Sequence, residues 1–199
     1  MTEQSPSRWK SRAIIIAVFL LFFAPVLVSW YLVFFTGYKH GGGVQHGILI
    51  DPPRQLEDVE LFDPLSGKTA RLHGKWTLLM MVTGSCDQAC TDNLYRMRQL
   101  QLVMGKDMYR LQRAAYFIDK IARQDAGRLF ADYAGQMLLS PAITMDEFLS
   151  GFKMNDKIDD HALYLIDPAG FLMMMYPADT DPSGIIKDLK RLFRNSKMD

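Results

Sequence analysis

The chain has few of the features on which phosphate-binding enzymes and nucleic-acid-binding proteins depend. Its 199 residues include only two cysteines and four histidines, and its formal net charge is +1. No glycine-rich phosphate loop, carboxylate dyad or nucleophile–base pair stands out, so the sequence gives no support for turnover of a small substrate. From Lys39 onward there are 20 basic and 21 acidic residues, after the three basic residues and one acidic residue before it are subtracted from the totals. Without a basic field, nucleic acid is not an expected partner.

One uncharged run is long enough to cross a membrane. Residues 13–35 contain no charged side chain, and a spanning helix needs about 20 apolar residues. Arg8, Lys10 and Arg12 precede the run, so the positive-inside rule predicts a cytoplasmic tail at residues 1–12 and an exported C-terminal part. A cleaved signal peptide is the alternative, but the run is longer than a usual signal core and no small-residue cleavage site follows it. We therefore expect an uncleaved anchor in which residues 13–35 contact lipid.

The segment after the anchor is predicted to be a linker. Residues 36–55 are rich in glycine and then in proline, which is typical of a linker. His40 and His46 lie in this segment without an acidic or thiol side chain beside them, so we interpret both as solvated residues rather than metal ligands. Residues 56–199 then provide a chain long enough for one domain of ordinary size.

Within residues 56–199, apolar strand-like segments alternate with helix-like segments. The predicted elements are a hairpin over 59–72, a strand over 76–82, a helix from Asp87 to about Tyr109, a strand over 114–118, helices over 125–133 and 145–152, a hairpin over 162–176, and a last helix capped by Asp181 with Pro182 at its first position. Residues 136–143 are ambiguous. This order predicts an α/β sandwich of the thioredoxin kind behind one N-terminal transmembrane helix.

The methionines are numerous enough to raise the question of a methionine-based copper site. Most fall on strand or helix positions that need apolar side chains, so we expect them to fill the core. In the run Met173, Met174 and Met175, strand alternation predicts Met174 on the opposite face from the other two.

The two cysteines, Cys86 and Cys90, follow the apolar run 76–82 at the predicted junction of strand and helix. Four residues apart at a helix start, they share one face with Cα atoms about 6 Å apart, within reach of a disulfide. Exposed N–H groups and the helix dipole should lower a thiol pKa there. A redox pair, a soft metal site completed by other ligands, a structural disulfide and two buried thiols all remain open.

An exported position has a consequence for these cysteines. Thiols outside the cytoplasm are ordinarily oxidised, so a working reduced pair implies a partner that acts as thiol reductant.

Two segments resemble the Sco/SenC family of membrane-anchored, copper-handling proteins that assist assembly of cytochrome c oxidase. They are GKWTLLMMVTGSCDQACTDNL, from Gly74 to Leu94, and DDHALYLIDPAGFL, from Asp159 to Leu172. In that family two cysteines and a histidine just before a strand bind copper. The resemblance therefore implies copper as the cofactor and Cys86, Cys90 and His161 as its ligands.

The same resemblance implies partners and a location. The partners are subunit II of cytochrome c oxidase, whose dinuclear copper site the family helps to assemble, and other copper carriers. The two ends of the chain also resemble short, anchored Sco-like proteins of proteobacteria. We therefore expect a single-pass protein of the bacterial inner membrane with its C-terminal domain in the periplasm.

The cysteine motif departs from the family pattern. Asp87 and Thr91 stand where the family usually has prolines, and Gln88 replaces an acidic residue, although Asp92 keeps the acidic position after the motif. The three expected ligands are nevertheless present.

Three functions follow from these observations. The first is a copper-binding assembly factor, a metallochaperone rather than an enzyme. The second is a thiol–disulfide oxidoreductase in which Cys86 attacks a partner disulfide and Cys90 resolves the mixed disulfide. The third is an adaptor that keeps the fold without the chemistry. Loss of His161 should abolish tight copper binding but spare most thiol exchange, which separates the first function from the second.

Overall fold

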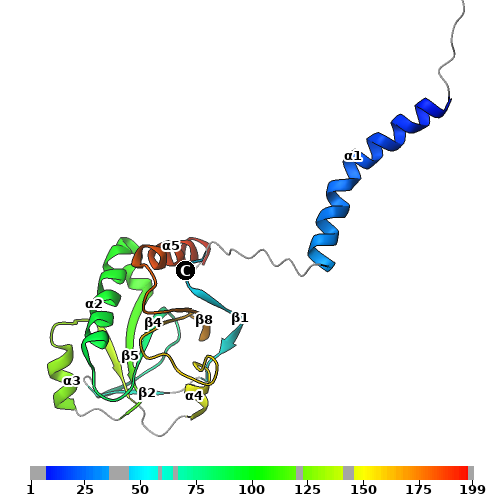
Figure 1. Cartoon of the computed structure of the whole chain (residues 1–199). Helices are drawn as coiled ribbons and strands as arrows, with labels where there is room; N and C mark the ends of the chain where they lie inside the picture. The colour runs from blue at the N-terminus through cyan, green and yellow to red at the C-terminus, as the bar shows by residue number, and fades with distance from the viewer. Residues whose placement is uncertain are drawn as a thin grey trace, which may run out of the picture. The chain divides into compact units, whose positions relative to one another are not determined.

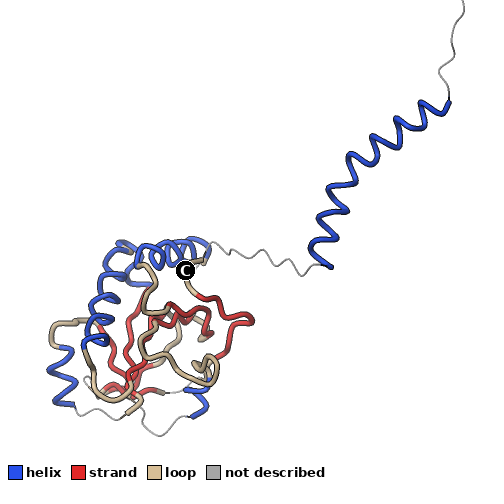
Figure 2. The backbone as a smooth tube through the Cα atoms, viewed as in Figure 1, coloured by secondary structure: helices blue, strands red, loops and turns tan. Residues whose placement is uncertain are grey.

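The computed structural model describes residues 8–35, 45–57, 60–64, 67–119, 123–140 and 146–196 (Figures 1 and 2). The chain divides into two compact units, residues 1–43 and residues 44–199.

The first unit contains one long helix, α1 (Arg8–Phe35), with Pro25 inside it. Its residues Arg12–Tyr31 have a mean hydropathy of 2.7, and none of them is buried. By length and composition this helix could cross a membrane. The expected helix over residues 13–35 is therefore confirmed.

The second unit holds a six-stranded sheet in the order β1-β8-β7-β4-β5-β6. The elements of this unit are β1 (Ile48–Gln55), β2 (Leu61–Asp63), β3 (Lys68–Ala70), β4 (Trp76–Val82), α2 (Gln88–Val103), the 3-10 helix η1 (Gly105–Arg110), β5 (Leu111–Phe117), α3 (Arg123–Phe130), β6 (Gln136–Leu139), α4 (Asp146–Ser150), β7 (Leu163–Ile166), β8 (Phe171–Tyr176) and α5 (Pro182–Asn195). Strands β4, β5 and β6 are parallel to one another. Strand β7 runs antiparallel to β4, β8 runs antiparallel to β7, and β1 runs antiparallel to β8. The short strands β2 and β3 form a separate pair.

Strand β4 lies at the centre of the core, and all seven of its residues are buried. Leu78 and Met80 belong to the core cluster that includes α2 and α5. Leu79 and Met81 belong to the cluster on the other face, which includes Phe148 of α4. Figures 1 and 2 show α2 and α5 together on one side of the sheet. The prediction of a strand buried on both faces is confirmed, and each of these side chains contributes about 1.5–3 kcal/mol of burial free energy.

The predicted linker over residues 36–55 is wrong from Ile48 onward, because Ile48–Gln55 forms strand β1. Ile48 pairs with Met175, and Gln55 pairs with Phe171, both antiparallel. The two prolines in this segment indicate a linker in the sequence, but an edge strand tolerates proline because one side of it needs no hydrogen-bond donors. The chain thus joins the sheet much earlier than its composition predicts.

Several element boundaries also differ from the prediction. Helix α2 ends at Val103 rather than near Tyr109, because Gly105 has a φ of +57° and the chain continues as the 3-10 helix. A left-handed residue after the last turn ends an α-helix, and glycine adopts it without strain. The ambiguous residues 136–143 include strand β6, and the last helix has the predicted Asp181 cap and Pro182.

The predicted alternation in β8 is wrong for Met173 and right for Met175. Met174 packs in the same cluster as Met173, whereas Met175 packs in the cluster on the other face. The pairing of β8 with β7 shifts register between the partners of Leu165 and Ile166. A bulge of this kind places two successive side chains on one face. Most of the described methionines nevertheless lie in or against the core, as expected, whereas Met108 is exposed.

Candidate functional site

The cysteines lie where strand β4 gives way to helix α2, as the sequence predicts. Asp87 is the N-cap of α2, and its carboxylate accepts a hydrogen bond from the backbone N–H of Cys90 at 2.9 Å. On the other side, Gly84 donates its N–H to Asp119 at 2.9 Å. Asp87, which stands where the Sco/SenC pattern usually has proline, is therefore the residue that caps α2.

Cys86 and Cys90 form a disulfide, with their Cα atoms 5.2 Å apart. Cys90 is only 6% exposed, whereas Cys86 is partly exposed at the edge of the core. The prediction that the pair can close is confirmed. In this oxidised state neither sulfur is a thiolate, so neither is a nucleophile or a strong metal ligand.

His161 and Cys90 line the same small pocket, of about 40 Å³. The lining residues are Met81, Val82, Thr83, Ser85, Asp87, Cys90, Asp160 and His161. Small-molecule sites are usually about 300–1,000 Å³, so this pocket suits a single ion or a few water molecules. The structure therefore brings the predicted histidine to the predicted cysteine motif from a segment about 70 residues away in the sequence.

The backbone of His161 is held on both sides. Its N–H donates to the carboxylate of Asp159 at 3.0 Å, and its carbonyl accepts a hydrogen bond from the side-chain amide of Asn93, also at 3.0 Å. The Tyr164 hydroxyl donates to the carbonyl of Asp159 and accepts from its N–H, each at 3.0 Å. These contacts fix the loop against both α2 and β7.

The imidazole of His161, by contrast, is accessible. Its side chain is 53% exposed, and its Nε2 lies 3.7 Å from a carboxylate oxygen of Asp160. An exposed pair of this kind contributes little to stability, so the ring can rotate without large cost. In the described part of the chain, no three His, Cys, Asp or Glu side chains are arranged to hold a metal ion.

The buried residues Asn93 and Tyr164 were not identified by sequence reasoning. Asn93 is 6% exposed and lies on α2 three residues after Cys90, so both side chains occupy one side of the helix. A buried amide within an apolar helix face needs a hydrogen-bond partner, which was the signal available in the sequence. Burial raises the pKa of the Tyr164 hydroxyl to about 12.

A wider groove adjoins His161 on the side of α5. Its volume is about 460 Å³, and its lining residues are Ala89, Asp92, Asn93, Arg96, His161, Ala178, Asp179, Thr180, Asp181 and Pro182. Arg96 donates hydrogen bonds to the carbonyls of Ala178 and Thr180, which closes one wall of the groove. Burial lowers the pKa of Arg96, while Asp179 and Asp181 act in the opposite direction.

The other histidines lie elsewhere. His46, interpreted from the sequence as a solvated linker residue, instead contacts Asp188 of α5 through both its backbone and its ring. The side chain of His46 is 40% exposed, as expected, but the residue does not lie in a linker, because its contacts with Asp188 hold it against the domain. His73 lies in the connection between β3 and β4 and packs beside Gly170. His40 lies outside the described residues.

The family model for the transmembrane-like, thioredoxin-like C-terminal domain matches residues 76–196. The matched segment is more than half of the chain and contains the cysteine motif, the His161 loop and α5. The chain belongs to this family. The predicted thioredoxin-like fold is therefore confirmed, together with an N-terminal apolar helix that could cross a membrane. No curated protein sequence matches the chain significantly.

Solved structures of Sco proteins share the fold. A SCO1/SenC family lipoprotein from Bacillus anthracis is 21% identical, with 72% of this chain and 99% of that chain covered and a TM-score of 0.58. Yeast Sco1 with copper bound is 18% identical, with 72% and 96% covered and a TM-score of 0.58. BsSco, described as a member of the Sco family of cytochrome c oxidase assembly proteins with a disulfide switch, is 16% identical, with 73% and 96% covered and a TM-score of 0.58.

Proposed function

We propose that this protein is a membrane-anchored copper carrier that helps to mature the copper site of cytochrome c oxidase subunit II. The observation that carries the proposal is the common pocket of Cys90 and His161, with Cys86 bonded to Cys90. The fold that this chain shares with Sco proteins also supports the proposal. One of those proteins is described with copper bound, and another is described as an oxidase assembly protein.

The donor set suits copper as cargo. Two thiolates and one imidazole are soft to intermediate ligands of the kind that bind Cu(I). Cys86, Cys90 and His161 would hold the ion, which when bound would be available for transfer to the ligands of an acceptor protein. The pocket at His161 has room for one ion, and the exposed imidazole needs only to rotate away from Asp160 toward the sulfurs.

Loading first requires reduction of the disulfide. The S–S bond accepts two electrons and two protons from a thiol reductant, which is itself oxidised to a disulfide. The two cysteines then ionise as they bind the metal, so binding releases protons. A thiol reductant and a second copper carrier are therefore the partners that the proposal requires, besides the oxidase subunit.

The anchor and the location complete the proposal. Helix α1 would cross the bacterial inner membrane once, with residues 1–12 in the cytoplasm and the thioredoxin-like domain in the periplasm. The support is the apolar segment Arg12–Tyr31, with basic residues before it.

Anaerobic titration of the reduced full-length chain in detergent with Cu(I) tests this function. We expect about one tightly bound ion per chain, and loss of tight binding in His161→Ala. His73→Ala is the matched control, because it removes an imidazole of the same domain outside the site. A stoichiometry well below one for the reduced wild-type chain, or equal binding by the His161 and His73 variants, would contradict the proposal.

A thiol–disulfide oxidoreductase is the second candidate, and the unequal exposure of the cysteines favours it. The thiolate of the more exposed Cys86 would attack a partner disulfide and expel one partner thiolate. Cys90 would then attack the mixed disulfide and expel the second, leaving this chain oxidised and the partner reduced by two electrons. His161→Ala would leave this exchange largely intact. If the chain were instead an adaptor without the chemistry, replacement of both cysteines would not impair its function.

A further inference from the structure

Helix α5 has one apolar face and one basic face. Ile185, Leu189 and Phe193 are buried against the sheet. The exposed cations of the helix are Lys187, Lys190, Arg191 and Arg194. At 3.6 residues per turn, these four side chains fall within a sector of about 100°. Asp188, the only acidic residue of α5, is buried on the flank of the helix and does not offset this charge.

The start of the domain is fastened to this same helix. The backbone N–H groups of His46 and Gly47 donate to one carboxylate oxygen of Asp188 at 2.7 and 3.2 Å, and the Nδ1 atom of His46 lies 3.2 Å from the other oxygen. Gly184 leaves no room for a Cβ atom beside the ring of His46. The chain therefore enters the domain at α5.

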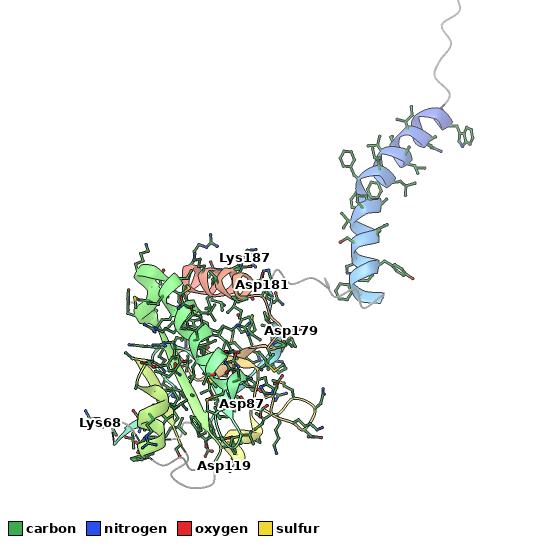
Figure 3. The ribbon with its side chains drawn as sticks, turned by 60° about the vertical axis from the view of Figure 1, so that its left-hand side comes forward. Lys68, Asp87, Asp119, Asp179, Asp181 and Lys187 are labelled. Atoms are coloured by element: carbon green, nitrogen blue, oxygen red, sulfur yellow. A yellow bond between two sulfur atoms is a disulfide. The ribbon has the colours of Figure 1, made fainter. Side chains whose placement is uncertain are left out.

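The tether that leads to this point is short. Gln45 lies ten positions after Phe35, the end of α1, and a stretch of ten positions spans at most about 35 Å. If α1 crosses the membrane, its covalent attachment keeps α5 near the lipid surface. Figure 3 shows Lys187 at one end of the domain and Asp87 and Asp119, which flank the cysteine site, toward the other end.

Exposed apolar side chains adjoin the end of α5. They are Leu102 and Val103 at the end of α2 and Met108 and Tyr109 in η1, and Tyr109 is 69% exposed. Arg110 links η1 to the end of α5, because its guanidinium donates to the carbonyl of Phe193 at 3.0 Å and to that of Ser196 at 2.6 Å. Tyrosine beside basic residues is typical of a membrane interface.

We propose that the basic face of α5, with these apolar side chains beside it, docks on the anionic phospholipid headgroups of the membrane in which α1 is anchored. This inference rests on the membrane anchorage proposed above, but it does not depend on copper. Docking would give the domain one orientation. Because the 16-residue helix α2 is about 24 Å long, the cysteines at its other end would face away from the lipid, toward an acceptor.

The test uses the full-length chain in lipid nanodiscs that carry a gadolinium-chelating lipid. Discs of phosphatidylcholine mixed with phosphatidylglycerol are compared with discs of phosphatidylcholine alone, and amide signals of the domain are measured by NMR. We expect selective paramagnetic broadening of α5 and η1 in the anionic discs only. The triple variant Lys187→Gln, Lys190→Gln and Arg191→Gln should lower the ratio of docked to undocked domain on the order of 100-fold, since each basic residue near an anionic surface contributes about 1 kcal/mol.

The matched control is Arg128→Gln, Lys153→Gln and Lys157→Gln, which removes the same charge from exposed positions outside α5. This control should keep the broadening. Equal broadening in both kinds of disc, or broadening that survives in the α5 variant, would overturn the inference. Cu(I) titration of the same wild-type samples separates the two proposals, because a wild-type domain that binds copper but shows no broadening in the anionic discs rejects docking alone.

Discussion

The two segments that meet at the pocket are held in opposite ways. The cysteine segment is fixed at its side chains by the disulfide and at its backbone by the Asp87 cap. The His161 segment is fixed only at its backbone, and its ring remains half exposed. The difference shows what each half must do to bind a metal ion. The sulfurs must change chemical state, whereas the imidazole needs only a rotation.

The largest expected effect comes from the sulfur side. The double variant Cys86→Ser and Cys90→Ser should lose both tight Cu(I) binding and thiol exchange, because a hydroxyl is neither a soft ligand nor a redox group. Anaerobic titration and exchange with glutathione measure the two activities. Met81→Leu is the matched control, since Met81 lines the same pocket but is also part of the core. Strong copper binding by the double variant would show that the two sulfurs are not copper ligands.

The second-largest effect on Cu(I) affinity should come from the hydrogen bond that supports the His161 backbone. Asn93→Leu leaves the imidazole in place but removes the amide that holds its carbonyl, and loss of such outer contacts typically lowers metal affinity 10–100-fold. Competition with a chromophoric Cu(I) chelator measures the affinity. Gln101→Leu is the control, because Gln101 also donates to backbone carbonyls, from the far end of α2, with Met108 at 3.2 Å. Equal losses in the two variants would show a general effect on folding.

Replacement of Asp160, the neighbour of the imidazole, should have a smaller effect on Cu(I) affinity, and in the opposite direction. Asp160→Asn removes the exposed pair with His161, and such pairs are worth about 0–1 kcal/mol. The ring would then turn toward the sulfurs more easily, and Cu(I) affinity should rise by up to about fivefold. Asp156→Asn, in the exposed loop before it, should leave the affinity unchanged. A fall in affinity would indicate that Asp160 assists metal binding instead.

The last prediction concerns the stability of the fold at alkaline pH and not the affinity of the site. The pKa of Tyr164 is raised from an ordinary value of 10 to about 12 in the folded chain, so the protonated hydroxyl stabilises the fold fully below pH 10. That contribution is lost as pH rises from about 10 to about 12. Denaturant unfolding at a series of pH values should show that the free energy of unfolding of Tyr164→Phe falls less steeply with rising pH than that of the wild type. Part of the fall should remain, because burial also raises the pKa of Tyr116 and Tyr176. Tyr95→Phe, at an exposed position, should behave as wild type.

Local sequence patterns predicted the elements that position the cysteines. The fully apolar run of β4, the capping residue Asp87 and the helical spacing of α2 each act over a few residues, so the junction could be recognised without knowledge of the rest of the fold. The strand after His161 was also recognised from its local pattern, but the role of His161 as a copper ligand came from the family resemblance. Its approach to Cys90 depends on the pairing of β7 with β4.

Long-range contacts could not be predicted in the same way. Strand β1 contains two prolines, and only its pairing with β8 distinguishes it from a linker. His46 acquires its partner Asp188 from a helix 142 positions away. Asn93 has the polarity of a surface residue, and its role depends on the carbonyl of a loop 68 positions away. Periodicity can place Asn93 on the apolar face of its helix, but neither periodicity nor composition identifies the partner in such pairs.

Copper K-edge X-ray absorption of the reduced, Cu(I)-loaded full-length chain tests the central claim most directly. We expect two sulfur scatterers and one nitrogen scatterer in the wild type, with the nitrogen lost in His161→Ala and retained in His73→Ala. A first shell that contains sulfur only, or a nitrogen contribution unchanged in His161→Ala, would contradict a site shared by Cys86, Cys90 and His161.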